Sequence, residues 1–161
     1  MFFNVSGAQI IAVEKDRDLI PFLQNKFREA KNVEIIQRDI LKFRNSKLEI
    51  RNYKVVANLP YYITSRFLRL YLSQTQFRPG LMVLMVQYEV AKRISAKPPG
   101  MNLLALSAQV YGKVEFIKKV SRGNFSPPPE VDSAIIKISE ISNKIFDKNK
   151  ISAEKFFEIA R

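Results

Sequence analysis

The stretch Val55 to Tyr62, written VVANLPYY, joins an apolar run to an amide, a proline and two phenols. A run of small and β-branched residues such as Tyr53 to Ala57 is typical of a strand in the interior of a sheet. Pro60 fixes its own φ and lacks an N–H, so the strand cannot continue through it. The sequence therefore predicts a buried strand whose carboxyl end carries polar and aromatic side chains.

Similar apolar runs occur on both sides of this strand. Further strands are expected at Gln9 to Val13, Val33 to Ile36, Leu81 to Val86, Val114 to Val120 and Ser133 to Ile138. The runs that begin at Gln9 and Leu81 are continuous enough to predict strands covered on both faces. Helical spacing is found from Asp18 onward, after the potential capping pair Thr64 and Ser65, and at Glu89 to Ile94, Leu103 to Tyr111 and Ser152 to Arg161. Alternating strands and helices followed by a strand pair predict an α/β fold, mainly parallel with an antiparallel edge.

The composition limits the chemistry that is available. The chain has 161 residues with neither Cys nor His, which removes thiol nucleophiles, Cys/His zinc sites and imidazole catalysis. Any reaction must use carboxylates, amides, hydroxyls, lysines or aromatic rings. We therefore expect no metal.

The charge and the hydrophobic pattern indicate the partners. With 27 Lys and Arg against 15 Asp and Glu, the net charge is +12, which favours a polyanion such as nucleic acid, although a basic surface can also serve solubility alone. The longest strongly apolar run, Leu81 to Val86, is far too short to span a membrane, and the first residues do not form a signal peptide. We expect a cytoplasmic protein with no membrane partner.

Acidic residues follow two of the predicted strands. Glu14 comes directly after the first strand, and Asp39 follows the second. Ligands of open α/β sheets bind outside the carboxyl ends of the strands, where an acid can accept hydrogen bonds from ribose hydroxyls. Each acid could instead cap the segment that follows it. A glycine-rich turn, which usually accompanies a nucleotide site, is missing, because all five glycines are isolated.

The Asn58-Leu59-Pro60-Tyr61 segment can be interpreted as an amine-binding site. The Asn58 side-chain oxygen and the next backbone carbonyl are two acceptors, which match the two donors of an exocyclic amine. Tyr61 could stack on the attached base, as aromatic residues do in pockets for flipped bases. The alternative is an ordinary turn with tyrosines in the core. The two acids at strand ends, Glu14 and Asp39, favour the amine-binding site over the ordinary turn.

These residues resemble the ribosomal RNA adenine dimethyltransferases (the KsgA family). Asn58-Leu59-Pro60-Tyr61 is similar to the family's amino-methyltransferase motif, and IIAVEKD and QRDILKF are similar to its cofactor-binding blocks. The later runs MVQYEVAKRI, PPGMNLLALSAQVYG and NFSPPPEVDSAIIKI resemble its further blocks in order and spacing. The resemblance covers about residues 9 to 161. The erythromycin-resistance methyltransferases share the first motif but match the later blocks less well.

The resemblance implies a role for each matching residue. The reaction would be S-adenosylmethionine-dependent dimethylation of two adjacent adenosines in the RNA of an immature small ribosomal subunit. The cofactor would contact Glu14 through its ribose and Asp39 through its adenine, with Lys15, Ile40 and Asn58 nearby. The target base would be held by the catalytic segment Asn58, Leu59, Pro60 and Tyr61 and faced by Phe125. The basic residues near the last block, Lys113, Lys118, Lys119 and Arg122, would either contact phosphate or form a solvated strand face.

The resemblance also implies a Rossmann-like class I methyltransferase fold that lacks its usual first strand. We expect a partial catalytic domain at residues 1–139 and the start of a helical domain at 140–161, with the family pattern truncated at both ends. Two strands would then lack a neighbour, although we expect a monomer. Two alternatives remain: an inactive RNA-binding fragment of this family and an erythromycin-resistance-type methyltransferase of large-subunit RNA.

Overall fold

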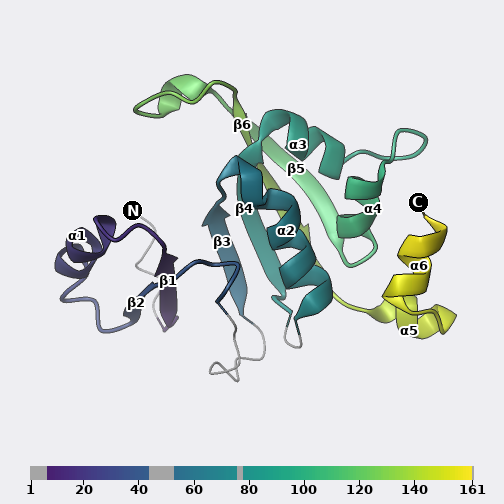
Figure 1. The fold of residues 1–161 in the computed structure, drawn as a ribbon, viewed down its shortest axis with the longest axis horizontal. Coiled ribbons are helices and arrows are strands. Elements are labelled where there is room, and N and C mark those ends of the chain that lie inside the picture. Colours follow the sequence, from purple (N-terminus) through teal and green to yellow (C-terminus); the bar gives the residue numbers. More distant parts are fainter. Residues whose placement is uncertain (1–6, 44–52, 76–77, 161) are drawn as a thin grey trace. The chain divides into compact units, whose positions relative to one another are not determined.

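The computed structural model describes residues 7–43, 53–75 and 78–160. The chain forms two compact units, Met1–Leu48 and Glu49–Arg161, which are described separately below. Figure 1 shows the helices and strands of both units.

The first unit is a strand–helix–strand element. Strand β1 (Ile10–Glu14) pairs in parallel with β2 (Val33–Gln37), and helix α1 (Leu19–Lys26) connects them. The helix begins after Asp18, as predicted, although the Asp18 side chain forms no capping hydrogen bond. All five residues of β1 are half-buried, so the prediction of a strand covered on both faces is wrong. The described part of this unit has only one helix to cover the strand pair.

The second unit contains a four-stranded sheet in the order β3-β4-β6-β5. Its strands are β3 (Lys54–Asn58), β4 (Leu81–Gln87), β5 (Lys113–Val120) and β6 (Ser133–Ser139). Strands β3 and β4 are parallel, whereas β6 runs antiparallel to both β4 and β5. The predicted α/β class, with parallel strands and an antiparallel edge, is confirmed.

Three helices pack on one face of this sheet: α2 (Thr64–Arg69), α3 (Tyr88–Ile94) and α4 (Leu103–Gln109) (Figure 1). The fully buried core between helices and sheet includes Phe67, Leu68, Leu72, Met82, Leu84, Val86, Ile94, Ile136 and Ile138. Strand β4 alternates between buried and half-buried residues, so the prediction that both of its faces are covered is also wrong. The apolar residues on its second face are Leu81, Val83 and Met85.

Helix α2 does not begin with a side-chain cap. A 3₁₀ turn, Tyr61–Ile63, leads directly into it, and Thr64 is already its first residue. The predicted capping by Thr64 and Ser65 is therefore wrong, because the 3₁₀ turn runs into the helix without a break and both residues lie inside the helix. A π-helical turn, Leu70–Gln74, continues the helix.

Each unit has a strand that is paired on one side only. Within the described residues, β1 pairs only with β2, and β3 pairs only with β4. Val56 in the middle of β3 is 82% exposed. Strands β2 and β5 are likewise paired on one side only in the described structure. Unpaired edges leave backbone donors and acceptors available, and the expectation that two strands have lost their usual neighbour stays a prediction.

Two short helices follow the last strand: α5 (Lys144–Asn149) and α6 (Ala153–Ile159). The Phe146 ring of α5 lies 5.2 Å from that of Tyr111 and 5.7 Å from that of Phe156, which attaches both helices to the sheet unit. Whether residues 140–161 begin a separate helical domain stays a prediction. Across the described ranges, no helix has the length and apolar character needed to cross a bilayer.

Candidate active site

The end of β3 carries an amide that no described residue engages. Asn58 is the last residue of the strand and is exposed, and its side chain forms no hydrogen bond with any residue that the structure describes. The next residue, Leu59, is 4% exposed, and its N–H donates to the Met85 carbonyl at 3.1 Å. The Pro60 carbonyl then accepts a hydrogen bond from Ile63 at 3.1 Å. The backbone around Asn58 is thus fixed on both sides, while its amide remains available.

Tyr61 is fixed by its hydroxyl. That oxygen lies 3.3 Å from the Ser133 hydroxyl and 3.5 Å from the Val131 carbonyl. Ser133 is only 3% exposed, so this end of the contact is buried. Tyr61 itself is half-buried and Tyr62 is 78% exposed, so neither ring is a core residue.

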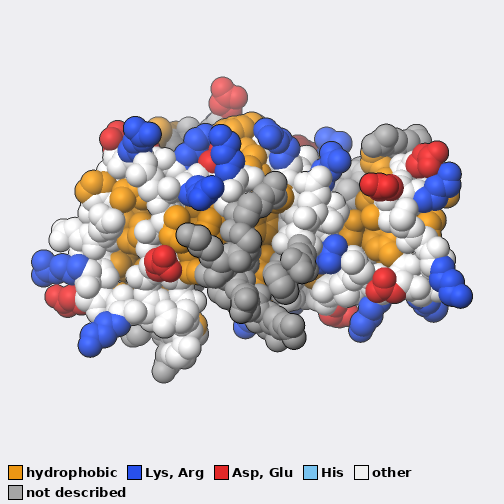
Figure 2. Space-filling view, turned by 60° about the horizontal axis from the view of Figure 1, so that its bottom comes forward, with side chains coloured by type: hydrophobic (Ala, Val, Ile, Leu, Met, Phe, Trp, Pro, Cys, Tyr) orange, Lys and Arg blue, Asp and Glu red, His pale blue; other side chains and the backbone are white. Residues whose placement is uncertain are grey.

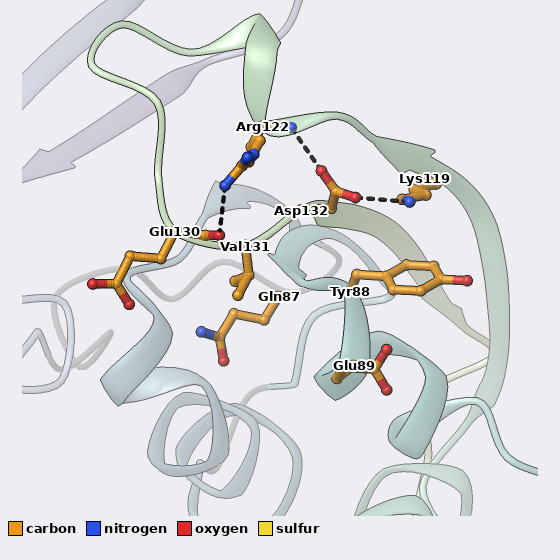
Figure 3. Close-up of a pocket in the computed structure, with 8 residues that line it drawn as sticks. All are labelled: Gln87, Tyr88, Glu89, Lys119, Arg122, Glu130, Val131 and Asp132. Atoms are coloured by element: carbon orange, nitrogen blue, oxygen red, sulfur yellow. Dashed lines mark hydrogen bonds and ion pairs between the residues drawn. The ribbon is translucent and has the colours of Figure 1, made fainter.

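The connection between β5 and β6 is closed by Asp132. Its carboxylate accepts a hydrogen bond from the Arg122 N–H at 2.9 Å and forms an ion pair with Lys119 at 2.7 Å (Figure 3). The hydrogen bond from Lys119, followed by that from the Arg122 backbone, lowers the pKa of Asp132 below its ordinary value. The same ion pair raises the pKa of Lys119. The connection is therefore held at its base by charged groups.

Phe125 lies inside this connection. It is half-buried, follows the 3₁₀ turn Arg122–Asn124, and donates its N–H to the Arg122 carbonyl at 3.2 Å. No ring contact joins Phe125 to Tyr61 among the described residues. The prediction that the two rings face opposite sides of a base does not require such a contact and stays a prediction.

The four predicted RNA-contacting residues differ in their surroundings. Lys113 pairs with Glu115 at 3.4 Å, and Lys137 pairs with the same carboxylate at 3.2 Å. The hydrogen bond from Lys137, followed by that from Lys113, lowers the pKa of Glu115. Lys119 pairs with Asp132. Within the described ranges, neither Lys118 nor Arg122 pairs with a carboxylate. Lys118 and Arg122 are therefore the more available of the four for phosphate.

Four of the five predicted cofactor residues, Glu14, Lys15, Asp39 and Ile40, lie in the first unit, whereas Asn58 lies in the second. One carboxylate oxygen of Glu14 accepts the N–H groups of Lys15 at 2.7 Å and of Asp16 at 2.8 Å. The Asp39 carboxylate accepts the Leu41 N–H at 2.9 Å, and the Lys15 ammonium lies 3.7 Å from its other oxygen. Glu14 closes the turn that precedes α1 and does not cap the helix itself, which begins at Leu19.

Two further features of the site had not been predicted from sequence. Ser133 holds Tyr61 from a strand 72 positions away, a contact that no local pattern indicates. Gln87 ends β4 beside a cavity of about 560 Å³. The pattern of a polar residue directly after an apolar strand, already used for Asn58, could have identified Gln87. Among the described residues, no group of three or more acidic side chains could hold a metal ion.

Comparison with known proteins places the chain in a family. The family model for "Ribosomal RNA adenine dimethylase" matches residues 1–160. The chain belongs to the ribosomal RNA adenine dimethylase family. "Ribosomal RNA small subunit methyltransferase A" of Dehalococcoides mccartyi is 46% identical over 157 residues, which cover 96% of this chain and 53% of that protein. The protein of the same name from Pseudomonas putida is 41% identical over 140 residues, covering 83% and 51% of the two chains.

Solved structures agree with this assignment. A dimethyladenosine transferase from Plasmodium falciparum superposes with a TM-score of 0.79 at 25% identity, covering 95% of this chain and 54% of the other. The 23S rRNA methyltransferase ErmE gives a TM-score of 0.73 at 25% identity, covering 85% and 54%. The fold is that of the class I methyltransferases. The chain spans about half the length of the curated relatives that it matches.

Proposed function

We propose that this chain provides the target-base side of an S-adenosylmethionine-dependent methyltransferase that acts on adenine N6 amines of small-subunit ribosomal RNA. The observation that carries the proposal is the exposed Asn58 amide, which forms no hydrogen bond with any described residue and lies close in sequence to the anchored ring of Tyr61. An amide without a partner at the end of a rigid strand is available for a ligand that offers hydrogen-bond donors.

The chemistry follows from the electronic structure of adenine. The lone pair of its N6 amine is delocalised into the ring, so the amine is a poor nucleophile. If the Asn58 side-chain oxygen and the Leu59 carbonyl accept both amine hydrogens, they favour a tetrahedral nitrogen with its lone pair directed at an electrophile. Tyr61 stacks on the base and holds it there, while Pro60 stiffens the turn between them. Such a site needs neither His nor Cys, and the chain has neither.

Phe125 is proposed to contact the base from the side opposite Tyr61. It lies in the connection that Asp132 closes, and the segment after it includes Val131, whose carbonyl is 3.5 Å from the Tyr61 hydroxyl. This shared segment supports a common role for the two rings, although they do not stack on each other.

The first unit offers groups that fit an adenosyl cofactor. S-adenosylmethionine would supply an electrophilic methyl group. The hydrogen bonds around Glu14 engage one carboxylate oxygen, so the second oxygen can accept from ribose hydroxyls. Asp39 can accept from the adenine amine, with Lys15 and Ile40 beside it. Asn58, in the second unit, is proposed as a further cofactor contact because its motif resembles that of the family.

The proposed partner is the RNA of an immature small subunit. A net charge of +12 favours a polyanion, and the side chains of Lys118 and Arg122 form no ion pair in the described structure. Lys113 and Lys119 would contact phosphate only after leaving the carboxylates of Glu115 and Asp132, with which they now pair. The names of the curated relatives support the small subunit as the target.

A transfer assay tests the proposal. Incubation of the chain with labelled S-adenosylmethionine should label adenosine in immature small subunits and not in large subunits. Asn58→Ala should reduce labelling about 100-fold or more, as expected when a hydrogen-bonding group that stabilises the transition state is removed. Tyr62→Phe, which changes only an exposed neighbour, is the matched control.

Other outcomes would contradict the proposal in distinct ways. Label confined to large-subunit RNA would indicate the erythromycin-resistance type. RNA binding without any calorimetric signal from S-adenosylmethionine would indicate a cofactor-free RNA-binding protein. Within the described residues, β1 pairs only with β2 and β3 only with β4, which leaves strand edges open and supports this second candidate.

A further inference from the structure

The outer edge of strand β3 is open. Within the described residues β3 pairs only with β4, so one side of its backbone has no partner strand (Figure 1). The carbonyl of Tyr53, directly before the strand, and the N–H of Leu59, directly after it, form hydrogen bonds on the side of β4, at 2.9 Å and 3.1 Å. Backbone groups of successive residues point to opposite sides of a strand. The N–H and C=O groups of Lys54, Val56 and Asn58 therefore point to the open edge.

This edge lacks the features that usually keep a strand from pairing with another chain. Such features include charged side chains and irregular pairing. Strand β5, at the other edge of the sheet, has a shift in its pairing register and four charged residues: Lys113, Glu115, Lys118 and Lys119. Strand β3 has one charged residue, Lys54, at its first position, and its central residue, Val56, is 82% exposed. Of the two edges of this sheet, β3 is the one open to pairing.

The side chain of Val56 lies on the face of the sheet that the three helices leave uncovered. Val56 is the register partner of Val83, which belongs to the half-buried side of β4. The neighbours of Val83 in sequence, Met82 and Leu84, are fully buried on the helix side. Register partners project to the same face of a sheet. A strand added at the edge of β3 would thus bring a further side chain against Val56.

We propose that β3 pairs antiparallel with β3 of a second copy of the chain, with Val56 on the two-fold axis. In this register Val56 faces the partner's Val56, and Lys54 faces the partner's Asn58. The residues that point to the open edge then face each other, and each facing pair exchanges two N–H···O bonds. The two lysines lie at opposite ends of the interface, so no like charges face each other, and each ammonium lies opposite a neutral amide. This dimer differs from the monomer expected from the sequence.

The open edge of β1 is less suited to such pairing. The Ile10 N–H and the Glu14 carbonyl each form a hydrogen bond of 2.8 Å on the side of β2. By the same alternation, only Ile11 and Val13 of this strand point their backbone groups to the open side. A pair of β3 strands can therefore form more hydrogen bonds than a pair of β1 strands.

The pairing would add a residue of the second copy to the proposed target site. Asn58 uses its backbone groups in the pairing, while its side chain projects from the face of the sheet and stays available. The partner's Lys54 lies directly opposite, at a Cα–Cα distance of about 5.5 Å for a hydrogen-bonded pair. A cation beside the Asn58 amide favours a phosphate group of bound RNA. This last consequence rests on the proposed function, whereas the dimer itself does not.

The association should be weak and should depend on salt. Strand β3 has five residues, which extend over about 17 Å, so the contact is smaller than a typical stable interface. Each chain carries a net charge of +12, and Lys and Arg side chains are spread over the surface that Figure 2 shows, so two copies repel each other. Salt screens this repulsion and should strengthen the dimer. RNA binding should respond to salt in the opposite direction.

A charge exchange on the two-fold axis tests the proposal. In sedimentation equilibrium, the wild-type chain should show a monomer–dimer equilibrium. Val56→Lys and Val56→Glu should each weaken the dimer at least about tenfold, because like charges then face each other. An equimolar mixture of the two variants should restore it, because a lysine then faces a glutamate. Ile159→Lys, which adds the same charge at an exposed apolar residue of α6, is the matched control and should leave the equilibrium unchanged.

Hydrogen exchange locates the contact within the strand. The Val56 amide points to the open edge, so its exchange should slow as the protein concentration and the fraction of dimer rise. The amides of Val55 and Ala57, which point toward β4, should be protected at every concentration. Circular dichroism of each variant verifies that the fold is retained.

Each other outcome would overturn the proposal. A chain that stays monomeric at high concentration and high salt, with fast exchange at Val56, does not use this edge. Slow exchange at Val56 in a monomer would show that a segment of the same chain covers the edge. Larger assemblies, or a dimer that Val56→Lys leaves intact, would contradict the two-fold pairing. A mixture that fails to restore the dimer would contradict the position of Val56 on the axis. None of these measurements uses methyl transfer, so they leave the proposed function to its own assay.

Discussion

The hydroxyl of Tyr61 lies 3.3 Å from the hydroxyl of Ser133, so the aromatic ring that follows β3 is attached to the first residue of β6. Ser133 is almost fully buried, and it directly follows the residue that closes the β5–β6 connection, Asp132. The orientation of the proposed stacking ring therefore depends on a strand that is distant in sequence. Substitutions in β6 can affect the target site without contacting RNA.

Replacing Tyr61 tests the two parts of its side chain separately. Tyr61→Phe removes the contact with Ser133 but keeps the ring, and should cost about 1 kcal/mol of unfolding free energy. Its effect on methyl transfer should stay below about tenfold, because a tenfold change requires about 1.4 kcal/mol and the lost contact, which orients the ring, is worth less. Tyr61→Ala also removes the stack, worth about 1–3 kcal/mol per base, and should raise the KM for RNA by a larger factor.

Urea denaturation and steady-state kinetics provide the two measurements. Ser133→Ala serves as the matched control, because it removes the same contact from the other side and should resemble Tyr61→Phe. Equal transfer rates for Tyr61→Phe and Tyr61→Ala would show that the ring does not stack on the target base.

The anchoring of the β5–β6 connection should depend on pH only in acid. The pKa of Asp132 is lowered in the folded protein, so its contribution to stability is present above the ordinary aspartate pKa of about 4. This contribution is lost as the pH falls through the lower folded-state value. Asp132→Asn should weaken the connection at neutral pH and remove this acid dependence, because the ion pair with Lys119 is then absent.

The Arg122 amide, which donates to Asp132, reports on this anchor by nuclear magnetic resonance. Its chemical shift should titrate with a midpoint below that of a solvent-exposed aspartate in the same sample. A midpoint at or above that reference would contradict the assigned contact.

Removing Glu14 should weaken cofactor binding. A hydrogen bond to a charged group is worth about 1.5–3 kcal/mol, so Glu14→Ala should reduce the affinity for S-adenosylmethionine at least about tenfold in calorimetry. Glu34→Ala, on the exposed side of the neighbouring strand β2, is the matched control and should leave the affinity unchanged. Equal affinities of the two variants for S-adenosylmethionine would show that Glu14 does not bind the ribose of the cofactor.

The strands and the polar residues at their ends could be predicted because both depend on local sequence. The apolar runs predicted β1, β2, β3, β4, β5 and β6 to within one or two residues. Asn58, Glu14 and Asp39 follow such runs, and parallel pairing brings the ends of neighbouring strands to the same edge. The family was identified from motifs of the same kind.

Features that depend on packing could not be predicted. The burial of β4 alternates because helices cover one of its faces, whereas its sequence is apolar on both. Helix α5 could not be predicted because it is short and has no capping side chain. It ends at Asn149, and the next residue, Lys150, has a left-handed φ of 51°. The contact between Tyr61 and Ser133 and the cavity beside Gln87 both require the β4–β6 pairing, which brings distant segments together.

Gly112, just before β5, should not tolerate a side chain. A Cβ at this position would lie 2.7 Å from the backbone oxygen of Ser139, the last residue of β6, and 3.2 Å and 3.3 Å from the side chains of Ile141 and Ile138. The nearest atom belongs to the backbone of a paired strand and cannot move without disturbing the sheet. Gly112→Ala should therefore cost about 1–3 kcal/mol of unfolding free energy, the usual range for overpacking.

Gly80→Ala is the matched control, because a Cβ there would meet nothing within 4 Å. Thermal and urea denaturation of the two variants should show a loss of stability for Gly112→Ala only. The first affected region should be the end of the sheet that carries α5 and α6, since Tyr111 contacts Phe146 there. Faster amide exchange in α5 and α6 of Gly112→Ala, with unchanged exchange around Asn58, would locate the effect. Equal stability of the two variants would show that β5 and β6 separate at this point without cost.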